Sequence, residues 1–240
     1  MQAFRCVAIG LLSLWLWLGW GTPVLAIDNL EEQVLQIIRD NPEVIIESVQ
    51  TYQQQQQQAQ QQSQQAVLQQ LKPKALIGTS PTLGPQRSAN VLVEFSDFQC
   101  PFCAQTATDI KPFLQQHPNQ VTFAYKHLPI QAIHDQAMPA AQASWAAQQQ
   151  GKFWPYHDAL FARQSELGNP LYIEIAQQLQ LDIKQFERDR NSDAAVKAIN
   201  ADLALAQKID IPGTPFFILN GQVLSSPFDA ADTAAMLVSR

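Results

Sequence analysis

The sequence predicts an α/β domain that follows a separate helical segment. Two observations predict the domain: an apolar run of β-forming residues at 91–95 leads into a helix-forming stretch at 104–116, and more β-formers flank the turn pair Asn220-Gly221. The chain has 240 residues, of which 46% are hydrophobic. This is enough for one sizeable core or two modest ones, which excludes a small disulfide-stapled protein.

The charge balance argues against a nucleic-acid partner. The 15 Lys and Arg are outnumbered by 21 Asp and Glu, so no basic field is available to hold a phosphate backbone. Three cysteines are also too few for a disulfide framework. Two of them, Cys100 and Cys103, are three positions apart and remain candidates for chemistry.

Residues 1–26 have the pattern of an export signal. Arg5 supplies positive charge, an apolar run follows at 6–20, and Val24-Leu25-Ala26 places small residues at positions −3 and −1 of a cleavage site. The run is shorter than the roughly 20 residues that cross a bilayer. We expect a soluble mature chain from Ile27 in the periplasm or an equivalent exported lumen, without Cys6. The alternative is an uncleaved N-terminal membrane anchor.

Residues 27–75 are predicted to form an N-terminal helical segment. Asp28 and Glu31 have capping-box spacing, and apolar residues recur at helical spacing as far as Ile38. Asn41-Pro42 then ends one helix and begins another.

The tract at 50–70 has two interpretations that the sequence leaves open. Gln occupies 14 of its 21 positions and none is charged, which is typical of disorder. A helix would instead align small and apolar residues along one seam, with Gln56 filling a gap, and would allow homo-oligomers through residues 27–72. The seam residues are Ile45, Val49, Tyr52, Ala59, Ser63 and Ala66.

Cys100 is expected where a strand leads into a helix. Pro101 suits the first helical position, so the unpaired N–H groups of the first turn would stabilise a thiolate at Cys100. Cys103, one turn later, is placed to attack a mixed disulfide formed at Cys100. Proteins use such a cysteine pair in three other ways. Attachment of c-type haem requires His directly after the second cysteine, and Ala104 occupies that position. A zinc site needs two further ligands, and the sequence offers none at a suitable spacing. A purely structural disulfide remains an open alternative.

Residues 90–103 resemble the active-site strand and helix of the DsbA-like thiol-disulfide oxidoreductases of bacterial envelopes, with the sequence N-V-L-V-E-F-S-D-F-Q-C-P-F-C. The resemblance covers about residues 76–240. It implies a thioredoxin-like fold with an inserted helical subdomain, here about 133–209, where the sequence indicates helices and no strand. Gly213-Thr214-Pro215 is similar to the family's cis-proline loop, and Asp229 is a candidate cap for a closing helix.

The resemblance implies the roles of the candidate site residues. Cys100, Cys103, Pro215 and Glu94 are assigned to catalysis, and Glu94 lies six residues before Cys100, where the family places a carboxylate beneath the site. Burial would raise its pKa and let it exchange a proton with Cys103. The alternatives are a solvated Glu94 with Asp97 as the acid, and an ordinary trans proline. Substrate contact is assigned to Thr214, Pro101 and Phe102, and His127 and His134 receive no role.

The functional prediction is an exported thiol-disulfide oxidoreductase that acts as an oxidase or isomerase through C-P-F-C and needs no cofactor or metal. Its expected partners are unfolded or misfolded exported proteins with cysteines, and a quinone-linked membrane protein that the resemblance implies. The pair Pro101-Phe102 differs from the Pro-His pair of the family's best-known oxidant, so the thiolate has one stabilising partner fewer. The alternative is a copper-binding or chaperone-like carrier that uses the same thiols without turnover.

Overall fold

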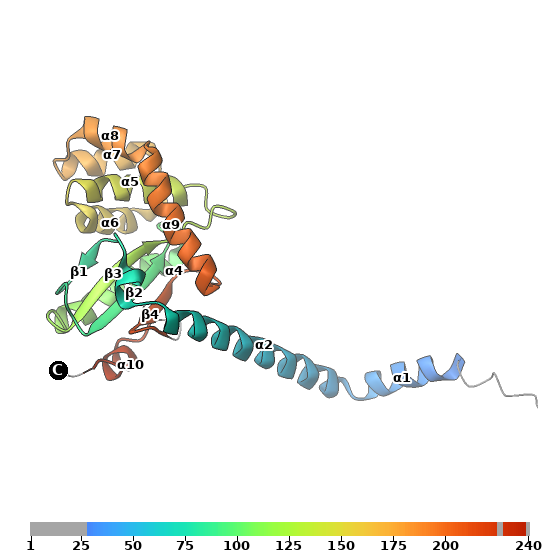
Figure 1. The fold of residues 1–240 in the computed structure, drawn as a ribbon. Coiled ribbons are helices and arrows are strands. Elements are labelled where there is room, and N and C mark those ends of the chain that lie inside the picture. Colours follow the sequence, from blue (N-terminus) through green and yellow to red (C-terminus); the bar gives the residue numbers. More distant parts are fainter. Residues whose placement is uncertain (1–27, 225–227, 239–240) are drawn as a thin grey trace, which may run out of the picture. The chain divides into compact units, whose positions relative to one another are not determined.

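A computed structural model of the chain describes residues 28–224 and 228–238, so the predicted export signal lies outside the described residues. The chain divides into two compact units, residues 1–57 and 58–240 (Figure 1). Helix α2 (Pro42–Gln70) begins in the first and continues into the second. Among the described residues, no helix combines the length and hydropathy needed to cross a membrane.

The described part of the first unit, residues 28–57, consists of helices. Helix α1 (Asp28–Asp40) ends at Asn41, whose side-chain amide donates a hydrogen bond of 2.8 Å to the carbonyl of Ile37, and α2 begins at Pro42. The glutamine-rich tract is helical to Gln70, so the helical interpretation holds over the disordered one. Its self-association stays a prediction.

The second unit is built on a five-stranded sheet with the order β1-β3-β2-β4-β5. The two central strands, β2 (Asn90–Ser96) and β3 (Val121–His127), are parallel and entirely buried. The others, β1 (Thr82–Leu83), β4 (Phe216–Leu219) and β5 (Gln222–Val223), each run antiparallel to their neighbour. As predicted, Asn220-Gly221 turns β4 into β5, with a φ of 54° at Asn220.

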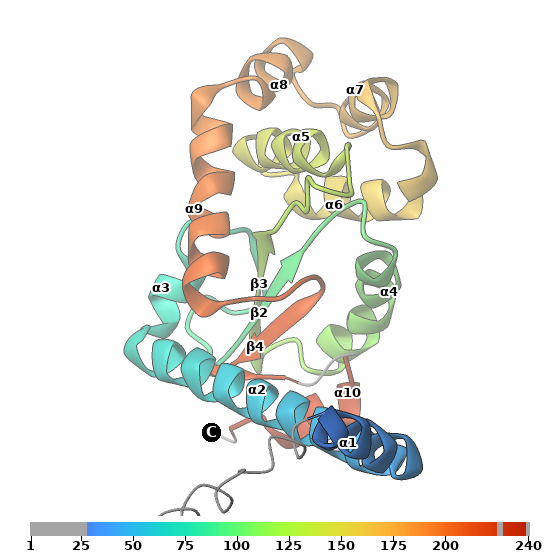
Figure 2. The same cartoon turned by 90° about the vertical axis from the view of Figure 1, so that its right-hand side faces the viewer.

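Helices cover both faces of the sheet (Figure 2). Because side chains alternate along a strand, Leu92 packs on the side of α4 (Pro101–Gln116) and α10 (Ala230–Ala235). Val93 packs on the other side, against α9 (Asp193–Ile209), α3 (Pro73–Ile77) and the last turns of α2. The predicted segment 27–75 therefore contributes to the core of the second unit from about Gln64 onward. Asp229 caps α10, as the sequence indicates.

Between β3 and β4 the chain forms the inserted helical subdomain. Its elements are α5 (Ala137–Gln149), α6 (Phe153–Ala162), the 3-10 turn η2 (Gln164–Glu166), α7 (Asn169–Gln178), α8 (Ile183–Arg190) and α9. All of residues 133–209 are described and none is in a strand, as predicted. The core of this subdomain includes Cys100 and Cys103, so the cysteines lie where α4 meets the inserted helices.

Candidate active site

Cys100 caps the N-terminus of α4, directly before Pro101 at the first helical position. Its pKa is lowered to about 5, mainly by a hydrogen bond from the side chain of Cys103 and further by Thr214 and by backbone N–H groups at the helix start, while burial opposes the shift. The residue is only 5% exposed. Cys103 and the helix start thus favour a thiolate at Cys100, as expected for an attacking or leaving sulfur.

Cys103 has the opposite character. It is 0% exposed, and burial, the hydrogen bond to Cys100 and the charge of Glu94 together raise the pKa of its thiol. The backbone N–H of Asp97 lies 3.5 Å from its sulfur. At neutral pH the pair therefore consists of a thiolate at Cys100 and a protonated thiol at Cys103.

Glu94 lies on the face of β2 that is covered by α4. It is 1% exposed, burial raises its pKa to about 7, and its Oε1 atom has no hydrogen-bond partner among the described residues. A carboxyl group with this pKa gains and loses its proton near neutral pH.

Asp97, the alternative acid, has both oxygens engaged. Its Oδ1 accepts from the Gln99 N–H at 2.8 Å, and its Oδ2 accepts from the Ile130 N–H at 2.9 Å and contacts His134 Nδ1 at 2.7 Å. This network ties the loop before α4 to the loop after β3. Asp97 and His134 therefore hold the loop before α4 in place. Of the two carboxyl groups, Glu94 is the one that has an oxygen without a hydrogen-bond partner among the described residues and can exchange a proton.

The loop before β4 lies against Cys100. The Thr214-Pro215 peptide bond is cis, and the Cys100 sulfur lies 3.5 Å from the Thr214 carbonyl oxygen, within reach of a hydrogen bond when the thiol is protonated. Pro101 is exposed and Phe102 is 74% exposed at the start of α4. The structure thus brings the sequence-predicted residues together around the Cys100 sulfur, and two of them, Cys103 and Glu94, are buried next to it.

Three contributors were not predicted from the sequence. The Gln164 amide donates to the carbonyls of Phe98 and Cys100, each at 2.9 Å, and so holds the active-site turn from the inserted subdomain. The side chain of Ser96 lowers the pKa of both Glu94 and Cys103, and the charges of these two groups raise the pKa of the buried Tyr125 hydroxyl beside them. Ser96 could have been found from the sequence, because a residue two positions after Glu94 in a strand lies on the same face of the sheet.

His127, which received no role, is a core residue. Burial lowers its pKa to about 4, so its ring is neutral, and it packs among the rings of Phe98, Tyr125 and Phe153. Within the described part of the chain, no three His, Cys, Asp or Glu side chains are grouped as a metal site would need.

Comparison with known proteins identifies the family. The model of a family described as thioredoxin matches residues 76–238. A thioredoxin-like oxidoreductase from Silicibacter pomeroyi DSS-3 has 28% identity and a TM-score of 0.62, over 70% of this chain and 100% of that one. The thiol-disulfide exchange protein α-DsbA2 from Wolbachia pipientis has 21% identity and a TM-score of 0.65, over 74% of this chain and 95% of that one. These matches confirm the predicted thioredoxin-like fold.

Curated relatives include much longer proteins. The Na(+)/H(+) antiporter NhaA 3 of Salinispora tropica is 32% identical over 156 residues, which are 65% of this chain and 24% of the antiporter. The chain therefore spans about a quarter of the length of that relative.

Proposed function

Because the chain belongs to the thioredoxin family, among its DsbA-like thiol-disulfide oxidoreductases, we propose that it exchanges disulfides with folding proteins through Cys100 and Cys103. The observation that carries this proposal is the contrast between the two thiols. The pKa of Cys100 is lowered to about 5, whereas that of the buried Cys103 is raised. Only Cys100 is then a good nucleophile and a good leaving group.

In the donating direction, a substrate thiolate attacks the Cys100 sulfur of the disulfide form. The Cys100–Cys103 bond breaks, its electron pair goes to Cys103, and Glu94 gives that sulfur its proton. A second substrate thiolate then attacks the substrate sulfur of the mixed disulfide and releases Cys100 as a thiolate. The substrate gains one disulfide, the enzyme becomes a dithiol, and an external quinone-linked oxidant must take up the two electrons.

The loop at Thr214 and the exposed start of α4 suit an extended, unfolded substrate. The Thr214 backbone lies beside the reacting sulfur, where it can pair with the backbone of a substrate segment. Phe102, at 74% exposure, offers an apolar contact next to it. We assign substrate contact to these residues and to Pro101.

The proposal is tested by refolding a reduced protein with several disulfides, and by insulin reduction, using the chain from Ile27. Wild type should accelerate at least one reaction, and Cys100→Ser should lose that activity. Equilibration with glutathione buffers then separates a donor of disulfides from a reductase. Inactive wild type that binds Cu(I) tightly would contradict the proposal and favour the carrier.

We further propose that the first unit mediates self-association. Ten large apolar side chains of α1 and early α2 are 38–62% exposed: Leu30, Val34, Leu35, Ile37, Ile38, Val44, Ile45, Ile46, Val49 and Tyr52. Isolated amphipathic helices are marginal in water, so a second or third copy of this segment is the proposed partner.

Light scattering at micromolar concentration tests this. The full mature chain should be a dimer or trimer, and a chain from Gln58 should be a monomer that keeps its thiol chemistry. This deletion spares Gln64 and Leu68, which are buried in the second unit. A monomeric mature chain would contradict self-association and weaken the case for an isomerase.

Export is proposed from residues 1–26. Fractionation of cells that produce the full chain should place the protein outside the cytoplasm with Ile27 as its first residue. Retention of residues 1–26 in the membrane fraction would instead support the anchor.

A further inference from the structure

The last turns of α2 contact the start of the loop that carries Thr214. The Gln64 amide donates to the Asp210 backbone carbonyl at 2.7 Å, and the Gln60 amide donates to the Asp210 carboxylate at 3.1 Å. Asp210 ends α9 with a φ of 60°, in the left-handed region. Four residues later, the Thr214 carbonyl oxygen lies 3.5 Å from the Cys100 sulfur. One short loop thus joins the two contacts.

Gln64 differs from its neighbours in the tract because it is buried. It is 4% exposed, whereas Gln61 and Gln62 are exposed on the same turns. One turn further, Leu68 is 1% exposed and packs in the core that contains Ile209. A buried amide is unfavourable unless it is hydrogen-bonded, and carbonyls at a helix end lack partners within the helix. The pairing of Gln64 with Asp210 satisfies both groups.

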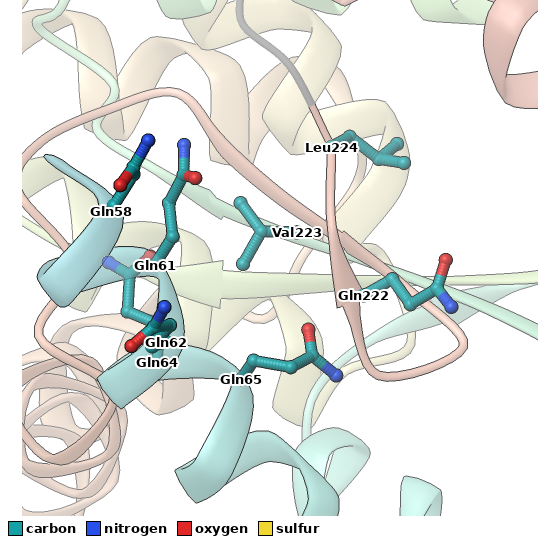
Figure 3. Close-up of a pocket in the computed structure, with 8 residues that line it drawn as sticks. All are labelled: Gln58, Gln61, Gln62, Gln64, Gln65, Gln222, Val223 and Leu224. Atoms are coloured by element: carbon teal, nitrogen blue, oxygen red, sulfur yellow. The ribbon is translucent and has the colours of Figure 1, made fainter. Parts of the chain in front are cut away.

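Gln65 makes the same kind of bond elsewhere. Its amide donates at 3.2 Å to the carbonyl of Gly221, in the turn between β4 and β5. A groove of about 600 Å³ is lined by this part of α2 and by residues 222–224 (Figure 3). Two adjacent glutamines of α2 therefore hold two different loops, and only the loop held by Gln64 leads to Thr214.

We propose that Gln64 is a positioning residue for thiol-disulfide exchange: by holding the Asp210 carbonyl, it fixes the start of loop 210–215 and keeps Thr214 against the Cys100 sulfur. The inference rests on the proposed function. It means that the end of the glutamine tract helps to position Thr214 beside the Cys100 sulfur. Gln60 adds a second, partly exposed bond to the same residue. The side chain of Thr214 is one of the groups that lower the pKa of Cys100, so displacement of loop 210–215 should raise that pKa and the Cys100 titration reports the position of the loop.

The test compares Gln64→Leu with the matched control Gln65→Leu in the mature chain. Thiolate absorbance near 240 nm gives the Cys100 titration, urea unfolding gives stability, and exchange assays give kcat and KM. Both variants should lose stability. Only Gln64→Leu should shift the Cys100 titration to higher pH and lower kcat by roughly two- to tenfold, the range of one lost hydrogen bond.

Equal Cys100 titrations in folded Gln64→Leu and Gln65→Leu would overturn the inference. If Gln64→Leu does not fold, Gln60→Leu decides, because its side chain is partly exposed: it should shift the titration in the same direction, and an unchanged titration would overturn the inference. The titration needs no substrate, so it can be recorded even if wild type has no exchange activity. An inactive wild type would contradict the proposed function, whereas equal titrations of the variants would contradict the role of Gln64.

Discussion

Replacing Cys103 with Ala should make the remaining thiol of Cys100 less acidic. The hydrogen bond from the Cys103 side chain is the largest cause of the lowered pKa of Cys100. Ala removes that donor and keeps the helix, since it is the best helix former. The contacts from Thr214 and from the backbone N–H groups at the start of α4 remain, so the shift should be partial.

The size of the effect follows from the pKa values. At a pKa of about 5, Cys100 is half ionised near pH 5. Loss of one hydrogen bond to the charged form should raise this pKa by roughly one unit, which lowers the thiolate fraction at pH 5 about fivefold. At pH 8 the sulfur should be ionised in both proteins, because an upward shift of this size leaves the pKa far below 8.

Thiolate absorbance near 240 nm, recorded from pH 3 to pH 9 on reduced mature protein, measures the shift. Wild type should show one thiolate with a midpoint near pH 5, because Cys103 stays protonated. Cys103→Ala should give the same amplitude at a higher midpoint. Thr108→Ala, an exposed change on α4, is the control and should match wild type. A midpoint in Cys103→Ala equal to or below that of wild type would refute the reasoning.

Three further predictions concern the groups around the site. Because the pKa of Glu94 is raised to about 7, the folded state keeps a proton there that the unfolded state releases near pH 4.5, whereas the lowered pKa values of Cys100 and His127 change stability in the opposite direction; in urea unfolding, wild type should therefore lose stability relative to Glu94→Gln as pH rises from 4.5 to 7, and a constant difference between the two proteins would contradict this. Gln164→Leu removes the side-chain donor to the carbonyls of Phe98 and Cys100, of which the Cys100 carbonyl keeps the backbone N–H groups of Cys103 and Ala104, and should cost about 1–3 kcal/mol in unfolding free energy and slow exchange, whereas unaltered exchange kinetics would contradict a role at the active-site turn. Lys126→Met breaks a buried 2.7 Å ion pair with Asp202 and should lower the unfolding free energy by about 3–5 kcal/mol; a loss below about 1 kcal/mol would show that the carboxylate is not left as an unpaired buried charge.

The parts of the site that sequence reasoning located are those encoded locally. Cys100 and Pro101 follow a buried strand at a spacing that defines a helix start, and Glu94 lies within that strand. Asn220-Gly221 specifies its own turn. In each case the neighbouring residues alone determine the backbone conformation, so the pattern is visible without knowledge of the fold.

The contributors that were missed depend on long-range packing. Tyr125 faces the site because it is paired with Glu94 across two parallel strands, and that register is set by the whole sheet. Gln164 reaches the Cys100 carbonyl only after the inserted helices pack on α4. Gln64 cannot be told from the other glutamines by composition, because its burial and its bond to the Asp210 carbonyl arise only in the folded chain. Sequence also left open whether the tract was helical.

The central claim, nucleophilic exchange at Cys100, is tested most directly by trapping its covalent intermediate. Reduced Cys103→Ala is mixed with a peptide that contains one disulfide: the Cys100 thiolate should attack, release one peptide thiol and remain joined to the other, since no second thiol resolves the bond. The account predicts a stable mixed disulfide that maps to Cys100 by non-reducing mass spectrometry and does not accumulate in wild type. Absence of the adduct at pH 7, where Cys100 should be ionised, would contradict it.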